Sequence, residues 1–170
     1  MKKTIIVSIL FIIWNILVIS YANAGVNDDF KAHALQAKVI HLLTGIPASI
    51  QLSQAYCETN FGKAEGIGTD LNNVFAIMDF PNDYWEFGNK KLSGAYGRNI
   101  YTWREYIHPI VSWIDHAYFF TVHAKFQLYK DWQFWCSNPP RYSGHPDYWP
   151  KIKRTIIKYK LYNHDIPILH

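Results

Sequence analysis

The sequence contains few of the residues that build metal sites or phosphate-binding loops. It has two cysteines with no C-x-x-C spacing, and none of its eight histidines forms an H-x-x-x-H pair. The ligand spacing of a zinc site is therefore absent. Gly66-x-Gly68 has no strand-like run before it and no lysine of the phosphate-loop pattern, which excludes a nucleotide loop. We expect no metal and no cofactor.

Clusters of one charge are also missing. The net charge of +4 comes from 17 basic and 13 acidic residues, and it lacks the Lys/Arg clusters of a nucleic-acid binder, so we expect no nucleic-acid partner. Acidic residues are sparse as well, since residues 87–103 contain none. An anionic polymer such as a cell wall stays compatible with this composition.

The N-terminus has the order of a secretory signal peptide. Lys2 and Lys3 precede the apolar run Ile5–Ile19, and the small-residue triplet Ala22-Asn23-Ala24 follows. We predict cleavage after Ala24, with export to the periplasm or the exterior and no stable membrane anchor afterwards. A retained anchor is the alternative. Removing 24 of the 170 residues leaves 146, which fits one domain over residues 25–170.

In an oxidising compartment the pair Cys57 and Cys136 has two interpretations. An even number of cysteines suggests one disulfide. Two small buried thiols are equally compatible with the sequence, because buried free cysteine is common.

Hydrophobic spacing predicts a mainly helical (α+β) domain. We expect helices from about residue 28 to 43, 48 to 58 and 147 to 159, with another over part of 126–135. The helical period also returns from Tyr106, with Pro109 near the start and one apolar face formed by Ile110, Trp113, Ile114, Ala117 and Tyr118. Gly, Asn and aromatic residues fill 66–102, where we expect an irregular lobe with at most a short hairpin. The fold is therefore a helical domain with a lobe inserted after its second helix.

Aromatic residues make up 17% of the chain. Their faces stack on sugar rings, so a carbohydrate groove is one use for them. Packing in the core of a small domain is the alternative for each individual ring.

Glu58 is the residue with the clearest chemical potential. It lies at the C-terminal end of a largely apolar predicted helix, beside aromatic residues and before Gly62. Poor solvation and the negative end of the helix dipole both raise the pKa of a carboxyl. A general acid needs such a pKa to hold its proton near neutral pH. A solvated surface glutamate is the alternative.

Four stretches in order resemble motifs of one enzyme family. Residues 53–64, SQAYCETNFGKA, are similar to A-Q-x-x-x-E-T-x-W-G-K-S, and residues 73–77, NVFAI, to N-L-F-G-I. Residues 103–106, WREY, resemble F-R-x-Y, and residues 142–148, YSGHPDY, resemble Y-A-T-D-P-x-Y. These are motifs of the glucosaminidases of glycoside hydrolase family 73, and the resemblance covers about residues 45–162.

The resemblance implies a lysozyme-like helical fold and hydrolysis of the β-1,4 bond after N-acetylglucosamine in peptidoglycan strands. Glu58 falls on the family's acid, and Tyr142 on a tyrosine that faces the acid across the cleft. Four further positions correspond to substrate-binding or supporting residues: Phe61, Asn73, Phe75 and Tyr106. Core packing is the alternative for Phe75 and Tyr106. The chain departs from the motifs at Phe61, Ala76 and Met78, where the family has Trp, Gly and Lys.

The identity of the second catalytic group has three candidates. Glycoside hydrolysis normally uses two carboxyls, and the family places the second on the inserted lobe. Glu86 is our first candidate for the base and Asp83 our second, while the N-acetyl group of the substrate is a third route. A non-catalytic peptidoglycan-binding or secretion-apparatus component that lost its base is the rival interpretation. The sequence indicates no specific secretion machinery or inhibitor partner.

Overall fold

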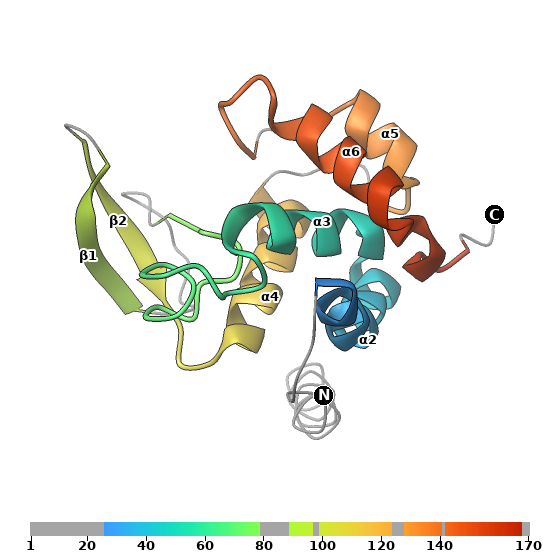
Figure 1. Ribbon diagram of the computed structural model, residues 1–170. Helices are drawn as coiled ribbons and strands as arrows, with labels where there is room; N and C mark the ends of the chain where they lie inside the picture. The colour runs from blue at the N-terminus through green and yellow to red at the C-terminus, as the bar shows by residue number, and fades with distance from the viewer. Residues whose placement is uncertain (1–25, 79–88, 97–98, 124–127, 141, 168–170) are drawn as a thin grey trace.

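The computed structural model describes residues 26–78, 89–96, 99–123, 128–140 and 142–167 (Figure 1). The predicted signal peptide and cleavage site lie outside these residues, and so do Asp83 and Glu86. The predictions made for them therefore stay predictions.

The first two helices agree closely with their predictions. Helix α2 spans Val26–Thr44 and helix α3 spans Ala48–Thr59. Gly45 makes the turn between them with φ of +74°, a conformation in which a side chain is strained. A Cβ at Gly45 would also lie 2.7 Å from the backbone nitrogen of Tyr129. Both the backbone conformation and the lack of space therefore require glycine at this position.

The C-terminal half is helical as expected, with shifted boundaries. Helix α4 spans Pro109–Tyr118 and continues into the π-helical turn Phe119–His123. Helix α5 covers Trp132–Ser137, which falls partly within the predicted stretch 126–135 and ends beyond it. The Asp131 carboxylate accepts a hydrogen bond from the Phe134 N–H and caps the helix start. Helix α6 spans Tyr148–Tyr159, and a 3₁₀ turn covers Leu161–His164.

The inserted lobe contains a short hairpin, which is the most regular structure that the sequence predicted for it. Strands β1 (Asn89–Tyr96) and β2 (Asn99–Glu105) pair antiparallel, from Asn89 opposite Glu105 to Tyr96 opposite Asn99. A register irregularity lies between Leu92 and Ala95. The hairpin projects to one side of the helices in Figure 1.

Helix α3 forms the centre of the domain. Every residue from Ala48 to Ala55 is buried, and α2, α4 and α6 lie around the helix in Figure 1. Of the predicted apolar face of α4, Ile110, Trp113 and Ala117 are buried, while Ile114 is half-buried and Tyr118 is exposed. Of the predicted inward positions of α6, Ile152 and Ile156 are buried and Tyr159 is half-buried. Because α3 is enclosed by other helices, a polar side chain at its end is held by several elements at once.

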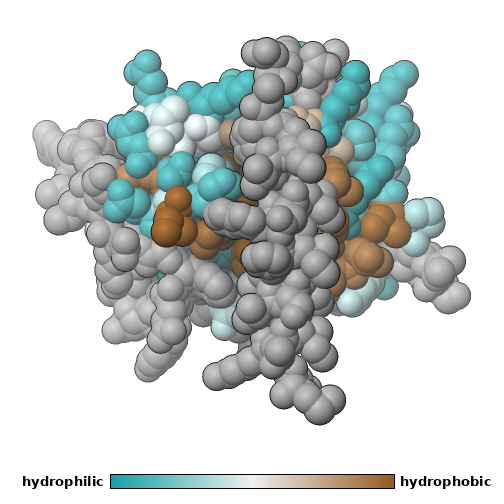
Figure 2. Space-filling view, turned by 90° about the horizontal axis from the view of Figure 1, so that it is seen from below, coloured by the Kyte–Doolittle hydropathy of each residue, from teal (hydrophilic) through white to brown (hydrophobic). Residues whose placement is uncertain are grey.

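The described surface seen from below shows both hydrophilic and apolar residues (Figure 2). Helix α2 carries three exposed leucines, Leu35, Leu42 and Leu43. Within the described residues no helix has the length and apolar character needed to cross a membrane. Cys57 and Cys136 are both half-buried free thiols, which decides between the two interpretations left open by the sequence.

Candidate active site

Glu58 lies in the last turn of α3, where the backbone reverses sharply. Asn60 adopts a left-handed conformation, with φ of 50°, and the backbone N–H groups at this C-cap return to the carbonyls of Ala55 and Tyr56. The Thr59 hydroxyl donates to the Val74 carbonyl at 2.5 Å and accepts from the Gly62 N–H at 2.8 Å. These bonds fix the end of the helix and thus the backbone that carries Glu58.

The pKa of Glu58 is raised above its ordinary value, as the sequence predicted. Burial is the main cause, since it disfavours the charged carboxylate. A hydrogen bond from the Tyr148 hydroxyl and the positive charge of Lys151 oppose the shift. The half-buried carboxyl therefore keeps its proton to a higher pH than a freely solvated glutamate does.

Tyr142 lies close to this carboxyl. The charge of Glu58 is one cause of the raised pKa of Tyr142, after burial, so the two side chains interact electrostatically. The Tyr142 hydroxyl donates a 2.9 Å hydrogen bond to the Phe75 carbonyl, and its ring lies 5.7 Å from that of Tyr148. Glu58 and Tyr142 are thus brought together from residues 84 positions apart in the sequence.

Asn73 and Phe75 are buried residues that support the site. The Asn73 amide donates to the carbonyls of Ile77 and Arg104 and accepts from the Ile77 N–H. These three hydrogen bonds join the turn to β2. The Phe75 ring is buried and stacks on His116 at 3.8 Å. Neither side chain is exposed to a substrate here, so we interpret both as supports.

Phe61 and Tyr106 are also core residues in this structure. Phe61 stacks on His33 at 4.8 Å and is 5% exposed. The Tyr106 hydroxyl donates a short hydrogen bond to Asp115, which also pairs with Arg104 at 3.1 Å. Direct contact with a substrate would require these rings to leave the core, so packing accounts for them as they lie.

The departure at Ala76 has a backbone consequence. Ala76 stands where the family motif has glycine, and its φ is 47°. The left-handed conformation costs a residue with a Cβ about 1–2 kcal/mol relative to glycine. The chain therefore keeps the backbone shape of the motif at some cost in stability.

A hollow of about 250 Å³ lies at the start of α6, and Glu58 is not among the residues that line it. Tyr148 and Lys151 line it, and the same two residues interact with Glu58. Lys151 also donates a 3.2 Å hydrogen bond to the Cys57 carbonyl at the end of α3. His145, Asp147 and Arg154 complete the lining.

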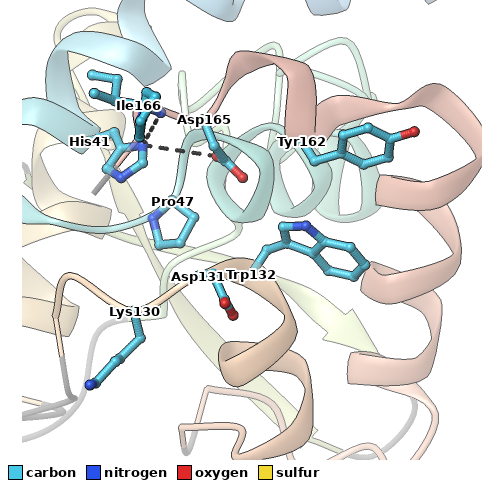
Figure 3. A pocket seen from close by; sticks show the side chains of 9 residues that line it. His41, Pro47, Lys130, Asp131, Trp132, Tyr162, Asp165 and Ile166 are labelled. Atoms are coloured by element: carbon cyan, nitrogen blue, oxygen red, sulfur yellow. Dashed lines mark hydrogen bonds and ion pairs between the residues drawn. The ribbon is translucent and has the colours of Figure 1, made fainter. Parts of the chain in front are cut away.

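A second hollow, of about 290 Å³, lies at the opposite end of α3 (Figure 3). Here the Asp165 carboxylate accepts from the Ser49 N–H at 2.8 Å and from the Ser49 hydroxyl at 2.7 Å. His41 accepts from the Ile166 N–H at 3.2 Å. Both oxygens of this carboxylate are thus occupied in holding the start of the helix.

Sequence reasoning missed the roles of Gln54 and Tyr148. Both letters belong to the quoted motifs, so the signal was present, but only the structure shows that they contact each other and that Tyr148 reaches Glu58. Among the described acids between Glu58 and α6, Glu65 and Asp70 are exposed, and Asp115 is paired with Arg104. None of these three is a free buried carboxylate.

Fold and site together define a glycoside hydrolase of the lysozyme-like helical class, with one buried acid at the end of its central helix. The chain belongs to the glucosaminidase family, whose model, described as mannosyl-glycoprotein endo-beta-N-acetylglucosaminidase, matches residues 34–161. It is therefore an endo-β-N-acetylglucosaminidase by family. A search of curated protein sequences found no match.

Solved structures confirm the fold. The catalytic domain of the autolysin Auto from Listeria monocytogenes is 19% identical, with 89% of this chain and 94% of that one covered and a TM-score of 0.61. A mutant of a peptidoglycan hydrolase from Sphingomonas sp. A1 is 21% identical, with coverage of 78% and 90% and a TM-score of 0.62. At these identities the likeness demonstrates the shared lysozyme-like fold.

Proposed function

We propose that this glucosaminidase cleaves the β-1,4 bond after N-acetylglucosamine in peptidoglycan strands, with Glu58 as the general acid. The single observation that carries the proposal is the half-buried Glu58 carboxyl with its raised pKa, held beside Tyr142 and Tyr148. One of the similar structures is named a peptidoglycan hydrolase and the other an autolysin, which supports peptidoglycan over other glycans that carry N-acetylglucosamine.

In the proposed reaction Glu58 gives its proton to the glycosidic oxygen as the bond to the anomeric carbon breaks. Water then adds its hydroxyl to that carbon and gives its proton to a base. Glu86 is our first candidate for this base and Asp83 our second, since both belong to the inserted lobe. The N-acetyl group of the substrate, acting in place of a protein base, is the third route.

We further propose that the protein acts outside the cytoplasm, in the periplasm or after secretion. The signal-peptide pattern of residues 1–24 supports this location. Peptidoglycan as substrate requires it as well, because the polymer lies beyond the inner membrane.

The test is digestion of purified sacculi by residues 25–170, followed by chromatography and mass spectrometry of the products. We expect muropeptides with N-acetylglucosamine at the reducing end, and loss of at least about a hundredfold in rate for Glu58→Gln, the lower bound for a general acid. Glu65→Gln is the matched control, because Glu65 is an exposed acid seven residues further on. Equal products from wild type and Glu58→Gln would refute the assignment.

A mannosyl glycoprotein offered in parallel distinguishes the substrate named in the family description from peptidoglycan. Cleavage of the glycoprotein alone would keep the family's reaction and reject our choice of polymer.

The second candidate function is a non-catalytic peptidoglycan-binding component. It is favoured by the scarcity of acids in the lobe, where residues 87–103 have none. Sedimentation with insoluble peptidoglycan separates the two: binding without any released product supports the module, and product supports the enzyme.

A further inference from the structure

A chain of two buried hydrogen bonds leads to Tyr148, whose hydroxyl interacts with the proposed acid Glu58. His116 Nε2 lies 3.1 Å from Gln54 Oε1, and Gln54 Nε2 lies 3.1 Å from the Tyr148 hydroxyl. His116 comes from α4, Gln54 from α3 and Tyr148 from α6. His116 and Gln54 are fully buried and Tyr148 is 9% exposed, so water does not compete for these bonds.

The protonation state of His116 fixes the direction of the chain. Burial lowers the pKa of His116 to about 3, so at working pH the ring is neutral and carries one N–H. Nδ1 has no hydrogen-bond partner among the described residues. A proton there would be an orphaned buried donor, which is rarer in proteins than an unsatisfied acceptor. The proton therefore lies on Nε2, which donates to Gln54.

Each later link follows from the first. Because Gln54 Oε1 accepts from His116, its amide Nε2 is the donor towards Tyr148. The Tyr148 oxygen thus accepts one bond, and its own proton is left to point at Glu58. Donors in such a chain polarise one another, so the last bond is stronger than an isolated one.

We propose that Gln54 and Tyr148 are positioning residues that set which oxygen of Glu58 holds the catalytic proton. The oxygen that accepts from Tyr148 is the less favourable place for a proton, because that proton would face the Tyr148 hydrogen. The transferable proton is therefore carried by the other oxygen. The chain also stabilises the carboxylate that remains after proton transfer, and it limits how far burial raises the pKa of Glu58.

This inference rests on the proposed function, but part of its test does not need turnover. Tyr148→Phe removes one hydroxyl and keeps the ring. We expect the pKa of Glu58 to rise further in this variant, because the bond that favours the ionised form is lost. Carbon-13 NMR of glutamate side-chain carboxyls, assigned with Glu58→Gln, measures that pKa directly. An unchanged Glu58 titration in Tyr148→Phe would overturn the proposal, even in a protein without turnover.

The activity arm uses the same variant on sacculi. We expect kcat to fall by roughly tenfold, the order for one charge-assisted hydrogen bond, with KM unchanged and the alkaline limb of the profile at higher pH. Tyr159→Phe is the matched control, because Tyr159 lies on the same helix and its hydroxyl pairs with Tyr56 instead. A wild-type protein without turnover refutes the proposed function. Normal wild-type turnover with superimposable profiles for wild type and Tyr148→Phe refutes only the positioning chain.

Gln54→Met provides the second variant. It keeps the length of the side chain and removes both amide contacts, so we expect a shift in the same direction as Tyr148→Phe and smaller. Thermal unfolding at each pH checks that both variants are folded. A folded Gln54→Met protein with the wild-type pKa for Glu58 would remove Gln54 from the chain.

Discussion

The two ends of helix α3 each hold a buried carboxyl with a raised pKa, yet only one of them is suited to catalysis. Asp165 lies at the N-terminal end and Glu58 in the last turn, separated by a 12-residue helix of about 18 Å. Burial is the main cause of both shifts. The pKa direction alone therefore does not distinguish a structural carboxyl from a general acid.

The difference lies in the hydrogen-bond partners. Both oxygens of Asp165 accept from Ser49, at the end of the helix where the dipole favours negative charge. Glu58 lies at the unfavourable end, with Tyr148 as its hydrogen-bond donor. A carboxyl held at one oxygen keeps the other for a proton, and that is what a catalytic acid requires.

The largest expected effect is at Glu58, and it has a stability counterpart. The folded-state pKa of Glu58 is raised, so the wild-type protein loses stability as pH rises through that pKa. Glu58→Gln does not titrate. We expect it to lose turnover and to unfold at a higher temperature than wild type at pH 8, with a smaller difference at pH 4. A lower Tm for Glu58→Gln at pH 8 would contradict the burial argument.

Tyr142→Phe should give the next largest effect on activity. It removes the hydroxyl near Glu58 and its bond to the Phe75 carbonyl, so we expect about a tenfold lower kcat and a stability loss of about 1 kcal/mol. Steady-state kinetics on sacculi and urea unfolding measure the two terms. Unchanged turnover would place Tyr142 among the structural residues.

Asp165→Ala is the opposite case and sharpens the comparison. Loss of the Ser49 contacts at the helix start should cost about 1–2 kcal/mol of stability, the range for a lost N-terminal cap. At temperatures below the new Tm we expect kcat to stay within about twofold of wild type, since Glu58 lies about 14 Å along the helix from the Ser49 that binds Asp165. A hundredfold loss of kcat in a folded protein would break the distinction between the two ends.

The charge of Lys151 should produce a smaller effect, confined to the pH profile. Lys151 lowers the pKa of Glu58, so Lys151→Met should raise it and move the alkaline limb of kcat to higher pH. Because Lys151 is exposed, the shift should shrink in 1 M salt. Lys153→Met, an exposed lysine two residues further along α6, is the control and should leave the profile unchanged.

The smallest expected change is a gain in stability at Ala76. Ala76→Gly relieves the left-handed strain at φ of 47° but makes the unfolded chain more flexible, so we expect a net gain of about 0.5–1 kcal/mol. Urea unfolding measures it, with kcat as the control for site geometry. A loss of stability would show that the Ala76 methyl contributes packing that outweighs the strain.

Local sequence patterns predicted the helices well and the site in part. The helical spacing of apolar residues in α4 and in the segment 147–159 correctly predicted that Ile110, Trp113 and Ile152 face inward. A helix face that packs in the core must be apolar. Helix α5 falls partly within the predicted stretch 126–135 and ends beyond it at Ser137, and the Asp131 cap that starts it was not recognised. Of the predicted substrate-contact residues, Phe75 and Tyr106 were the ones for which core packing was weighed, and both are buried.

Periodicity and the chemistry of neighbouring residues predicted the helical class, an irregular lobe with at most a short hairpin, and the position of Glu58 at a helix end. Tertiary structure alone decided that Cys57 and Cys136 stay apart as free thiols, and that Gln54, His116 and Tyr148 meet beside the acid. These contacts join residues up to 94 positions apart. No local pattern encodes them, since they exist only once three helices have packed around α3.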